Sequence, residues 1–140
     1  MILVDTGPLV AAALAGDVNH MRCVELFTSV HLTGEQLTVP SLVVTEACYL
    51  IAREAGPKVE TEFVRSLAAG DFSLIEVGPA DLARAAELMD QYADLPLGVV
   101  DAVVVAMAER LGVTEVATLD RRHFTVVRPR HTATLTLLPH

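Results

Sequence analysis

The stretch that decides the fold runs from Val99 to Leu111 and reads V-V-D-A-V-V-V-A-M-A-E-R-L. Its residues are apolar almost all the way round a helix, which is typical of a helix buried inside a domain. Asp101 falls in the first turn, where the helix dipole and unpaired backbone N–H groups favour a carboxylate. An ionised acid among so many apolar neighbours is costly to bury unless it is paired or bound to a cation. The question is therefore which other residues gather around Asp101.

Apolar runs that suit strands alternate with helical segments along the rest of the chain. Strands are expected at residues 2–4, 37–40, 72–77, 115–119 and 134–138. Helices are expected at residues 9–15, 19–30, 42–54, 57–69, 79–92 and 99–111, and an arginine-rich turn at residues 121–124. Ser41 is the expected N-cap of the third helix and Gly112 the end of the last. Strands alternating with helices predict an α/β fold, a three-layer α/β/α sandwich around a mostly parallel sheet.

Length and composition limit the class of protein. The chain has 140 residues, 52% of them hydrophobic, which fits a single domain over residues 1–140 and excludes a disordered chain. No apolar run reaches the roughly 18 to 20 residues of a membrane span. The opening Met-Ile-Leu-Val-Asp lacks the basic and long apolar segments of a signal peptide. We therefore expect a soluble, cytoplasmic protein with no membrane partner.

The cysteines and histidines give little support to a zinc enzyme. Cys23 and Cys48 both fall in expected helices among apolar neighbours, which predicts two reduced core side chains. The five histidines are scattered and form no H-x-x-x-H pair. Neither residue type has the close spacing that zinc ligands require.

Charge is distributed unevenly along the chain. All 18 acidic residues lie within residues 1–120, whereas residues 121–140 hold four basic residues and no acid: Arg121, Arg122, Arg128 and Arg130. The net charge of −8 argues against a general nucleic-acid-binding protein, because phosphate contacts normally need a basic surface. A basic strip beside an acidic pocket is still compatible with a polyanion drawn in by bound cations and a few arginines.

Four acidic residues are expected to converge at one edge of the sheet. Right-handed crossovers place the carboxyl ends of all parallel strands at the same edge, and Asp5 and Asp120 each follow a strand there. Asp101 begins the buried helix, and Glu46 lies one turn into a helix entered from that edge. Taken alone, Asp5 equally suits a turn or a helix N-cap, and Glu46 a solvated helix edge. Together with Asp101 and Asp120, they favour a shared polar pocket.

Carboxylates crowded in this way need compensation. Two such charges about 4 Å apart repel by roughly 4 kcal/mol at an effective dielectric near 20, so the group requires raised pKa values or divalent cations. Hard oxygen ligands without cysteine or histidine select Mg²⁺ or Mn²⁺. Such a site suits hydrolysis of phosphodiester bonds by a metal-activated water. Thr6, Thr118 and Asp94 are expected to support the ligands; Thr118 also fits an ordinary strand threonine.

Four segments together resemble the PIN-domain ribonucleases, and most closely the VapC-type toxins of type II toxin–antitoxin pairs. The segments are M-I-L-V-D-T-G ending at Gly7, P-S-L-V-V-T-E ending at Glu46, D-L-P-L-G-V-V-D-A ending at Ala102, and T-L-D-R-R-H-F ending at Phe124. Each segment alone is commonplace, but their order and spacing are fairly specific. The resemblance extends over nearly the whole chain.

This resemblance implies a five-stranded parallel sheet and Mg²⁺- or Mn²⁺-dependent cleavage of single-stranded RNA. It also implies a homodimer, and inhibition by a cognate antitoxin whose peptide arm fills the active-site groove. By motif match the catalytic, metal-binding acids are Asp5, Glu46, Asp101 and Asp120, and the family's threonine falls on Thr118. Arg121 and Arg122 are expected either to hold the RNA backbone or to be solvated turn residues.

Other interpretations fit the residues less well. A phosphoaccepting receiver domain needs a lysine near its last strand, and the only lysine is Lys58. A phosphatase with an aspartyl nucleophile would carry a second acid two residues after Asp5, where Gly7 stands. A P-loop protein is excluded because G-x-x-x-x-G-K is absent. A catalytically inactive PIN-like module that binds protein or RNA is the alternative; loss of an acid would favour it, and none is lost.

Overall fold

A computed structural model describes residues 1–140 and contains one five-stranded sheet whose strands are all parallel. The strands are β1 (Ile2–Val4), β2 (Leu37–Pro40), β3 (Ser73–Ile75), β4 (Glu115–Ala117) and β5 (Thr136–Leu138), in the order β3-β2-β1-β4-β5. The predicted five-stranded parallel sheet is therefore confirmed. Strands β1, β2 and β4 are almost entirely buried, as expected of parallel strands covered on both faces.

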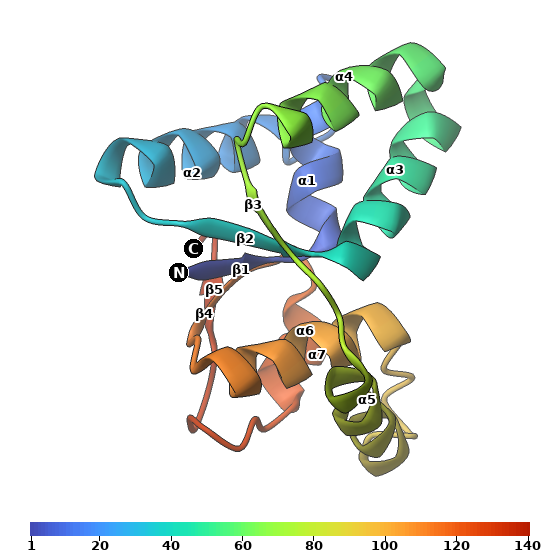
Figure 1. The fold of residues 1–140 in the computed structure, drawn as a ribbon, viewed down its shortest axis with the longest axis vertical. Helices are drawn as coiled ribbons and strands as arrows, with labels where there is room; N and C mark the ends of the chain where they lie inside the picture. Colours follow the sequence, from blue (N-terminus) through green and yellow to red (C-terminus); the bar gives the residue numbers. More distant parts are fainter.

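Helices cover both faces of the sheet, which gives the predicted three layers (Figure 1). One face carries α1 (Thr6–Ala13), α2 (His20–Thr33), α3 (Ser41–Ala55) and α4 (Pro57–Ala68). The other carries α5 (Pro79–Gln91), α6 (Val99–Leu111) and α7 (Arg121–Val126). The chain thus leaves β1 on one face and returns to β4 from the other. In open α/β sheets, a ligand site forms at the carboxyl ends of the strands where this reversal occurs.

Helix α6 has the bounds and the burial that its sequence predicts. Every residue from Ala102 to Ala108 is buried, and the helix packs against α5 and contacts β1. Gly112 ends it with a left-handed φ of +67°, a conformation that costs glycine little because it has no Cβ. This placement brings the N-terminal turn of α6, which carries Asp101, beneath the central strand.

Ion pairs at the far end of α6 fix it against α5. Arg84 of α5 donates two hydrogen bonds to the Glu109 carboxylate, at 2.7 and 3.0 Å. Arg110 donates two to Asp81, at 2.7 and 3.1 Å. Bidentate arginine–carboxylate pairs have a fixed geometry, so α6 is restrained both by its apolar faces and by these contacts.

Two local predictions are wrong. Ser41 is the first residue of α3 rather than its N-cap, and its hydroxyl accepts a hydrogen bond from the Val77 N–H at 3.3 Å. Residues 121–126 form helix α7 rather than a turn. The Asp120 carboxylate stabilises the start of that helix because it accepts a hydrogen bond from the His123 N–H at 3.1 Å, as an N-cap does.

The remaining sequence expectations can be placed directly. Cys23 is buried, Cys48 is half-buried, and both are free thiols. Helices of the structure are either too short or too polar to cross a bilayer.

Candidate active site

A cavity of about 580 Å³ lies at the carboxyl edge of the central strands, and all four predicted acids line it. They come from four separate places in the chain: the end of β1, the second turn of α3, the first turn of α6 and the start of α7. The acids are Asp5, Glu46, Asp101 and Asp120. Their convergence depends on the parallel sheet, which brings these element ends to one edge.

Asp5 is the most deeply placed of the acids. Its side chain is buried, with the residue only 5% exposed, and its backbone N–H continues the β1–β4 pairing by donating to the Ala117 carbonyl at 2.9 Å. Burial raises the pKa of the Asp5 carboxyl, hydrogen bonds from the Thr118 hydroxyl and the Thr6 N–H oppose the rise, and Glu46 and Asp120 add to it. Burial and neighbouring like charges thus both oppose ionisation of Asp5.

Thr118 connects two of the acids. Its buried hydroxyl donates a hydrogen bond to Asp5 Oδ2 at 2.8 Å and accepts one from the Asp120 N–H at 3.0 Å. A hydroxyl can donate one and accept two hydrogen bonds, so this single side chain orients Asp5 and fixes the backbone of Asp120. The supporting position expected for Thr118 agrees with these contacts.

Asp101 is the acid most perturbed by its surroundings. Its pKa is raised to about 7, first by burial and then by the charges of Asp5 and Asp120, while His123 works in the opposite direction. Since an ordinary aspartate titrates near 4, this carboxyl is only partly ionised at neutral pH unless a cation joins it. Perturbed groups of this kind are typical of functional sites.

Glu46 and Asp94 occupy more open positions. Glu46 is exposed and lies on the rim of the cavity, from where its charge raises the pKa values of Asp5 and Asp101. Asp94, expected to support the ligands, is exposed in the segment between α5 and α6 and does not line the cavity. The backbone carbonyl of its neighbour Leu95 contacts His123 instead.

His123 is a site residue that the sequence analysis missed. Its Nδ1 contacts Asp120 Oδ2 and lies 3.8 Å from Asp101 Oδ2, and its Nε2 lies 3.0 Å from the Leu95 carbonyl oxygen. The hydrogen bond to Asp120 is the main reason why the pKa of His123 is raised. A sequence signal existed, because residues three apart in a helix lie on the same side, but it required residues 121–126 to be recognised as a helix.

Donor chemistry of the cavity fits a hard divalent cation. Ligand atoms of Asp101, Asp120 and His123 lie within 4.8 Å of one another, and Asp5 and Glu46 add carboxylates around the same space. The buried hydroxyl of Thr6, which also lines the cavity, has no hydrogen-bond partner. Carboxylate oxygens are the main donors around this space, and they are ligands that Mg²⁺ and Mn²⁺ prefer.

The two arginines expected to hold RNA follow Asp120 directly and are both exposed in α7. The Arg121 guanidinium donates a hydrogen bond to the Pro139 carbonyl at 2.7 Å, so it is anchored to the C-terminal segment. Arg122 makes no hydrogen bond or ion pair with the protein. Both lie beside the acidic cavity without lining it.

Comparison with known proteins agrees with this architecture. Residues 2–128 match the PIN domain family. Ribonuclease VapC26 of Mycobacterium tuberculosis is 33% identical over 138 residues, which cover 99% of this chain and 100% of the relative.

Solved structures with low sequence identity share the fold. VapC20 of Mycobacterium tuberculosis, described as a toxin that cleaves the sarcin–ricin loop, superposes with a TM-score of 0.79 at 20% identity, covering 86% of this chain and 91% of that one. FitAcB of Neisseria gonorrhoeae gives 0.70 at 19% identity, covering 98% and 96%. VapBC2 of Rickettsia felis, bound to promoter DNA, gives 0.68 at 16% identity, covering 98% and 97%. With its acids at the switch point of a parallel sheet and its full-length likeness to VapC26, the chain belongs to the PIN domain family, in the VapC-type branch.

Proposed function

We propose that the protein is a Mg²⁺- or Mn²⁺-dependent endoribonuclease that hydrolyses single-stranded RNA and acts as the toxin of a toxin–antitoxin pair. The observation that carries this proposal is the convergence of Asp5, Asp101 and Asp120 with Glu46 on one cavity. Their mutual repulsion, expressed in the raised pKa of Asp101, is relieved by a divalent cation. The full-length similarity to a protein named a ribonuclease supports the same chemistry.

Oxygen atoms of Asp5, Asp101, Asp120 and Glu46 would hold the ion. Carboxylate oxygens are the ligands that Mg²⁺ and Mn²⁺ prefer. When bound, such an ion lowers the pKa of a water molecule and neutralises charge on a phosphodiester. No serine or cysteine lines the cavity, and the hydroxyl of its threonine, Thr6, is buried, so we infer that water is the nucleophile.

The protein's own residues hold and orient the reacting groups. Thr118 fixes Asp5 and the Asp120 backbone through its two hydrogen bonds, and the Thr6 N–H donates a further hydrogen bond to the Asp5 carboxylate. Arg121 and Arg122, at the start of α7 beside Asp120, would contact the RNA backbone. Their positive charge offsets part of the repulsion between a polyanion and an acidic protein.

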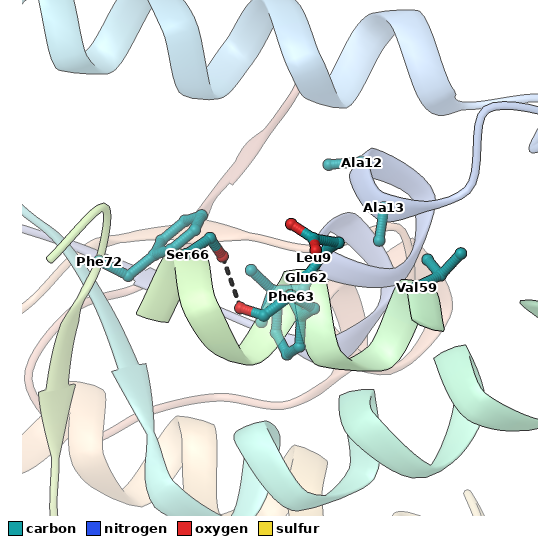
Figure 2. A pocket seen from close by; sticks show the side chains of 8 residues that line it. All are labelled: Leu9, Ala12, Ala13, Val59, Glu62, Phe63, Ser66 and Phe72. Atoms are coloured by element: carbon teal, nitrogen blue, oxygen red, sulfur yellow. Dashed lines mark hydrogen bonds between the residues drawn. The ribbon is translucent and has the colours of Figure 1, made fainter. Parts of the chain in front are cut away.

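An antitoxin arm would occupy a groove that leads away from the acids. Figure 2 shows its distal pocket, an apolar cavity of about 240 Å³ between α1 and α4 that is closed at one end by Phe72. A second cavity, of about 650 Å³, shares Ala13 and Val59 with this pocket and Val10 and Leu50 with the acidic cavity. We propose that the arm runs along these neighbouring cavities on α1, α3 and α4, with apolar side chains in the distal pocket. We also expect the protein to be a homodimer.

The proposed activity is tested by cleavage of single-stranded RNA with purified protein in Mg²⁺, Mn²⁺ or EDTA. Wild type should cleave RNA with either ion and not in EDTA. Asp101→Asn should lose cleavage by at least about a hundredfold, since it removes a ligand that no neighbour replaces. Asp90→Asn, which changes an exposed acid of α5, is the matched control and should retain it. Metal-independent cleavage, or an active Asp101→Asn variant, would overturn the proposal; absence of cleavage by wild type would favour the inactive module.

A further inference from the structure

The ring of His123 is held at both of its nitrogens. Nε2 lies 3.0 Å from the carbonyl oxygen of Leu95, in the segment between α5 and α6. Nδ1 contacts Asp120 Oδ2 and lies 3.8 Å from Asp101 Oδ2. The ring is half-buried, and His123 lies in the first turn of α7, which Asp120 caps. The ring therefore has one orientation, with Nδ1 directed at two of the four acids.

The Leu95 carbonyl fixes the role of Nε2. A carbonyl oxygen only accepts hydrogen bonds, so Nε2 must donate, and Nδ1 is the nitrogen that faces the carboxylates. In the metal-free protein Nδ1 can carry a second ring hydrogen and donate it to Asp120 Oδ2; a divalent ion held by the two carboxylates would displace that hydrogen and bind Nδ1 in its place. Histidines that bind metals have this arrangement, in which one nitrogen binds the ion and the other donates to a backbone carbonyl.

We propose that Nδ1 of His123 is a ligand of the divalent ion held by Asp101 and Asp120, which makes the site a mixed nitrogen–oxygen centre. This inference rests on the proposed metal-dependent function and adds a ligand to it. The ligand atoms of the three residues lie within 4.8 Å of one another. Nδ1 lies 3.8 Å from Asp101 Oδ2, a separation that one ion with bonds of about 2.0–2.2 Å can span. Asp101 and Asp120 supply the oxygens and His123 the nitrogen.

A nitrogen ligand changes which metal the site prefers. Mg²⁺ takes oxygen ligands and retains several waters, whereas imidazole binds transition-metal ions well. The site should therefore bind Mn²⁺ more tightly than Mg²⁺, and His123 should account for much of the difference. A site made of the four acids alone would have no such dependence on His123.

The test is electron paramagnetic resonance of the metal-free protein titrated with Mn²⁺ alone. Spin-echo spectra of the wild-type complex should contain the ¹⁴N coupling of a directly bound imidazole, a result that needs no variant. In His123→Gln, whose amide can still donate to Leu95, the coupling should vanish and the Mn²⁺ Kd should rise at least about tenfold. The Mg²⁺ Kd, measured by competition, should change by less than about threefold, because Mg²⁺ depends on the oxygens.

A matched control is His131→Gln. His131 also has its Nε2 hydrogen-bonded to a backbone carbonyl, that of Val113 at 2.6 Å, but it lies outside the acidic cavity; its replacement should leave the coupling unchanged. If wild type binds Mn²⁺ and cleaves RNA without a nitrogen coupling, the inference is wrong while the proposed function stands. Parallel weakening of Mn²⁺ and Mg²⁺ in His123→Gln would likewise overturn it and assign His123 the role of positioning Asp120. A wild type that binds no divalent ion would overturn both.

Discussion

At the scale of single residues, the site is dominated by the free energy of placing acids near one another away from water. Asp5 is buried and Asp101 half-buried, yet neither is paired with a lysine or arginine. Two acids of the α5–α6 contact are instead neutralised: Asp81 pairs with Arg110 and Glu109 with Arg84. The pKa values of these paired acids are lowered, whereas those of the two cavity acids are raised. Ionising the unpaired carboxyl groups of the cavity therefore lowers the free energy of unfolding of the metal-free protein.

This contrast gives a prediction about Asp101 and pH. Its pKa is about 7 in the folded protein and near 4 in an unfolded chain, so between these values the folded state binds more protons. The contribution of Asp101 to the unfolding free energy of the metal-free protein is therefore complete below about pH 4 and is lost as pH rises to about 7. The Asp101→Asn variant has no carboxyl group at this position, so its unfolding free energy does not fall in this way.

The difference is measured by urea unfolding in EDTA at pH 5 and pH 8. Relative to wild type, Asp101→Asn should gain about 1–3 kcal/mol more at pH 8 than at pH 5. Contributions of Asp81 and Glu109 cancel, because both proteins contain them. Asp90→Asn should show no such gain. An equal difference between Asp101→Asn and wild type at the two pH values would show that Asp101 does not titrate between them.

At the scale of elements, α1, α3 and α4 cover one face of the sheet and leave apolar pockets between them. The distal pocket between α1 and α4 is open and mainly apolar, with Glu62 and Ser66 as its polar members (Figure 2). Apolar surface left open in this way is typical of a binding groove. The intermediate cavity shares Val10 and Leu50 with the acidic cavity, so under the proposed function an arm bound along this face would end near the acids.

A substitution in this groove should separate inhibition from catalysis. Ala13 lines both apolar cavities but not the acidic one, so Ala13→Glu should leave RNA cleavage near the wild-type rate. Adding charge and bulk where apolar side chains dock should weaken binding of an antitoxin, expressed from a neighbouring short reading frame, by at least about tenfold. Ala15→Glu, which changes an exposed residue at the edge of the groove, is a milder comparison. Full inhibition of Ala13→Glu by the antitoxin would exclude this groove as the docking site.

At the scale of the whole molecule, the distribution of charge matters more than its sum. A protein of net charge −8 repels RNA at long range, yet residues 121–140 carry four arginines and no acid. Arg128 and Arg130 are partly occupied, since the Arg128 guanidinium donates to Thr125 and Arg130 pairs with Glu87. The Arg121 guanidinium also donates to a carbonyl, that of Pro139, but Arg121 and Arg122 directly follow Asp120, a lining residue of the cavity. We therefore expect these two arginines to meet a phosphate there.

Neutralising these two arginines should weaken RNA binding and reduce its dependence on salt. For Arg121→Gln with Arg122→Gln, the slope of log K against log salt should decrease by about 1 to 1.5, as expected for the loss of two contacts to a single strand. Binding is measured with the Asp101→Asn protein so that the RNA is not cut. Arg65→Gln, on the exposed face of α4, is the control. An unchanged slope in the double variant would show that Arg121 and Arg122 are solvated residues that do not contact the RNA.

Local sequence determined the elements and much of the site. Both ends of helix α6 could be predicted, because its apolar residues on all sides, the acid in its first turn and Gly112 at its end are local signals. The parallel sheet follows from strands alternating with helices, and the rule that parallel strands end at one edge predicted where Asp5 and Asp120 lie. These inferences depend on periodicity and chirality, which act over a few residues at a time.

Only the tertiary structure decided the contacts that join distant segments. His123 meets Asp120 because six residues coil into α7, and meets Leu95 because the segment between α5 and α6 folds back on that helix. The same packing leaves the Thr6 hydroxyl without a partner and keeps Asp94 away from the cavity. Such contacts depend on side-chain packing between elements far apart in the chain, for which no local pattern carries a signal. The sequence by itself therefore determined which acids would share an edge, and the tertiary structure decided which other atoms face them.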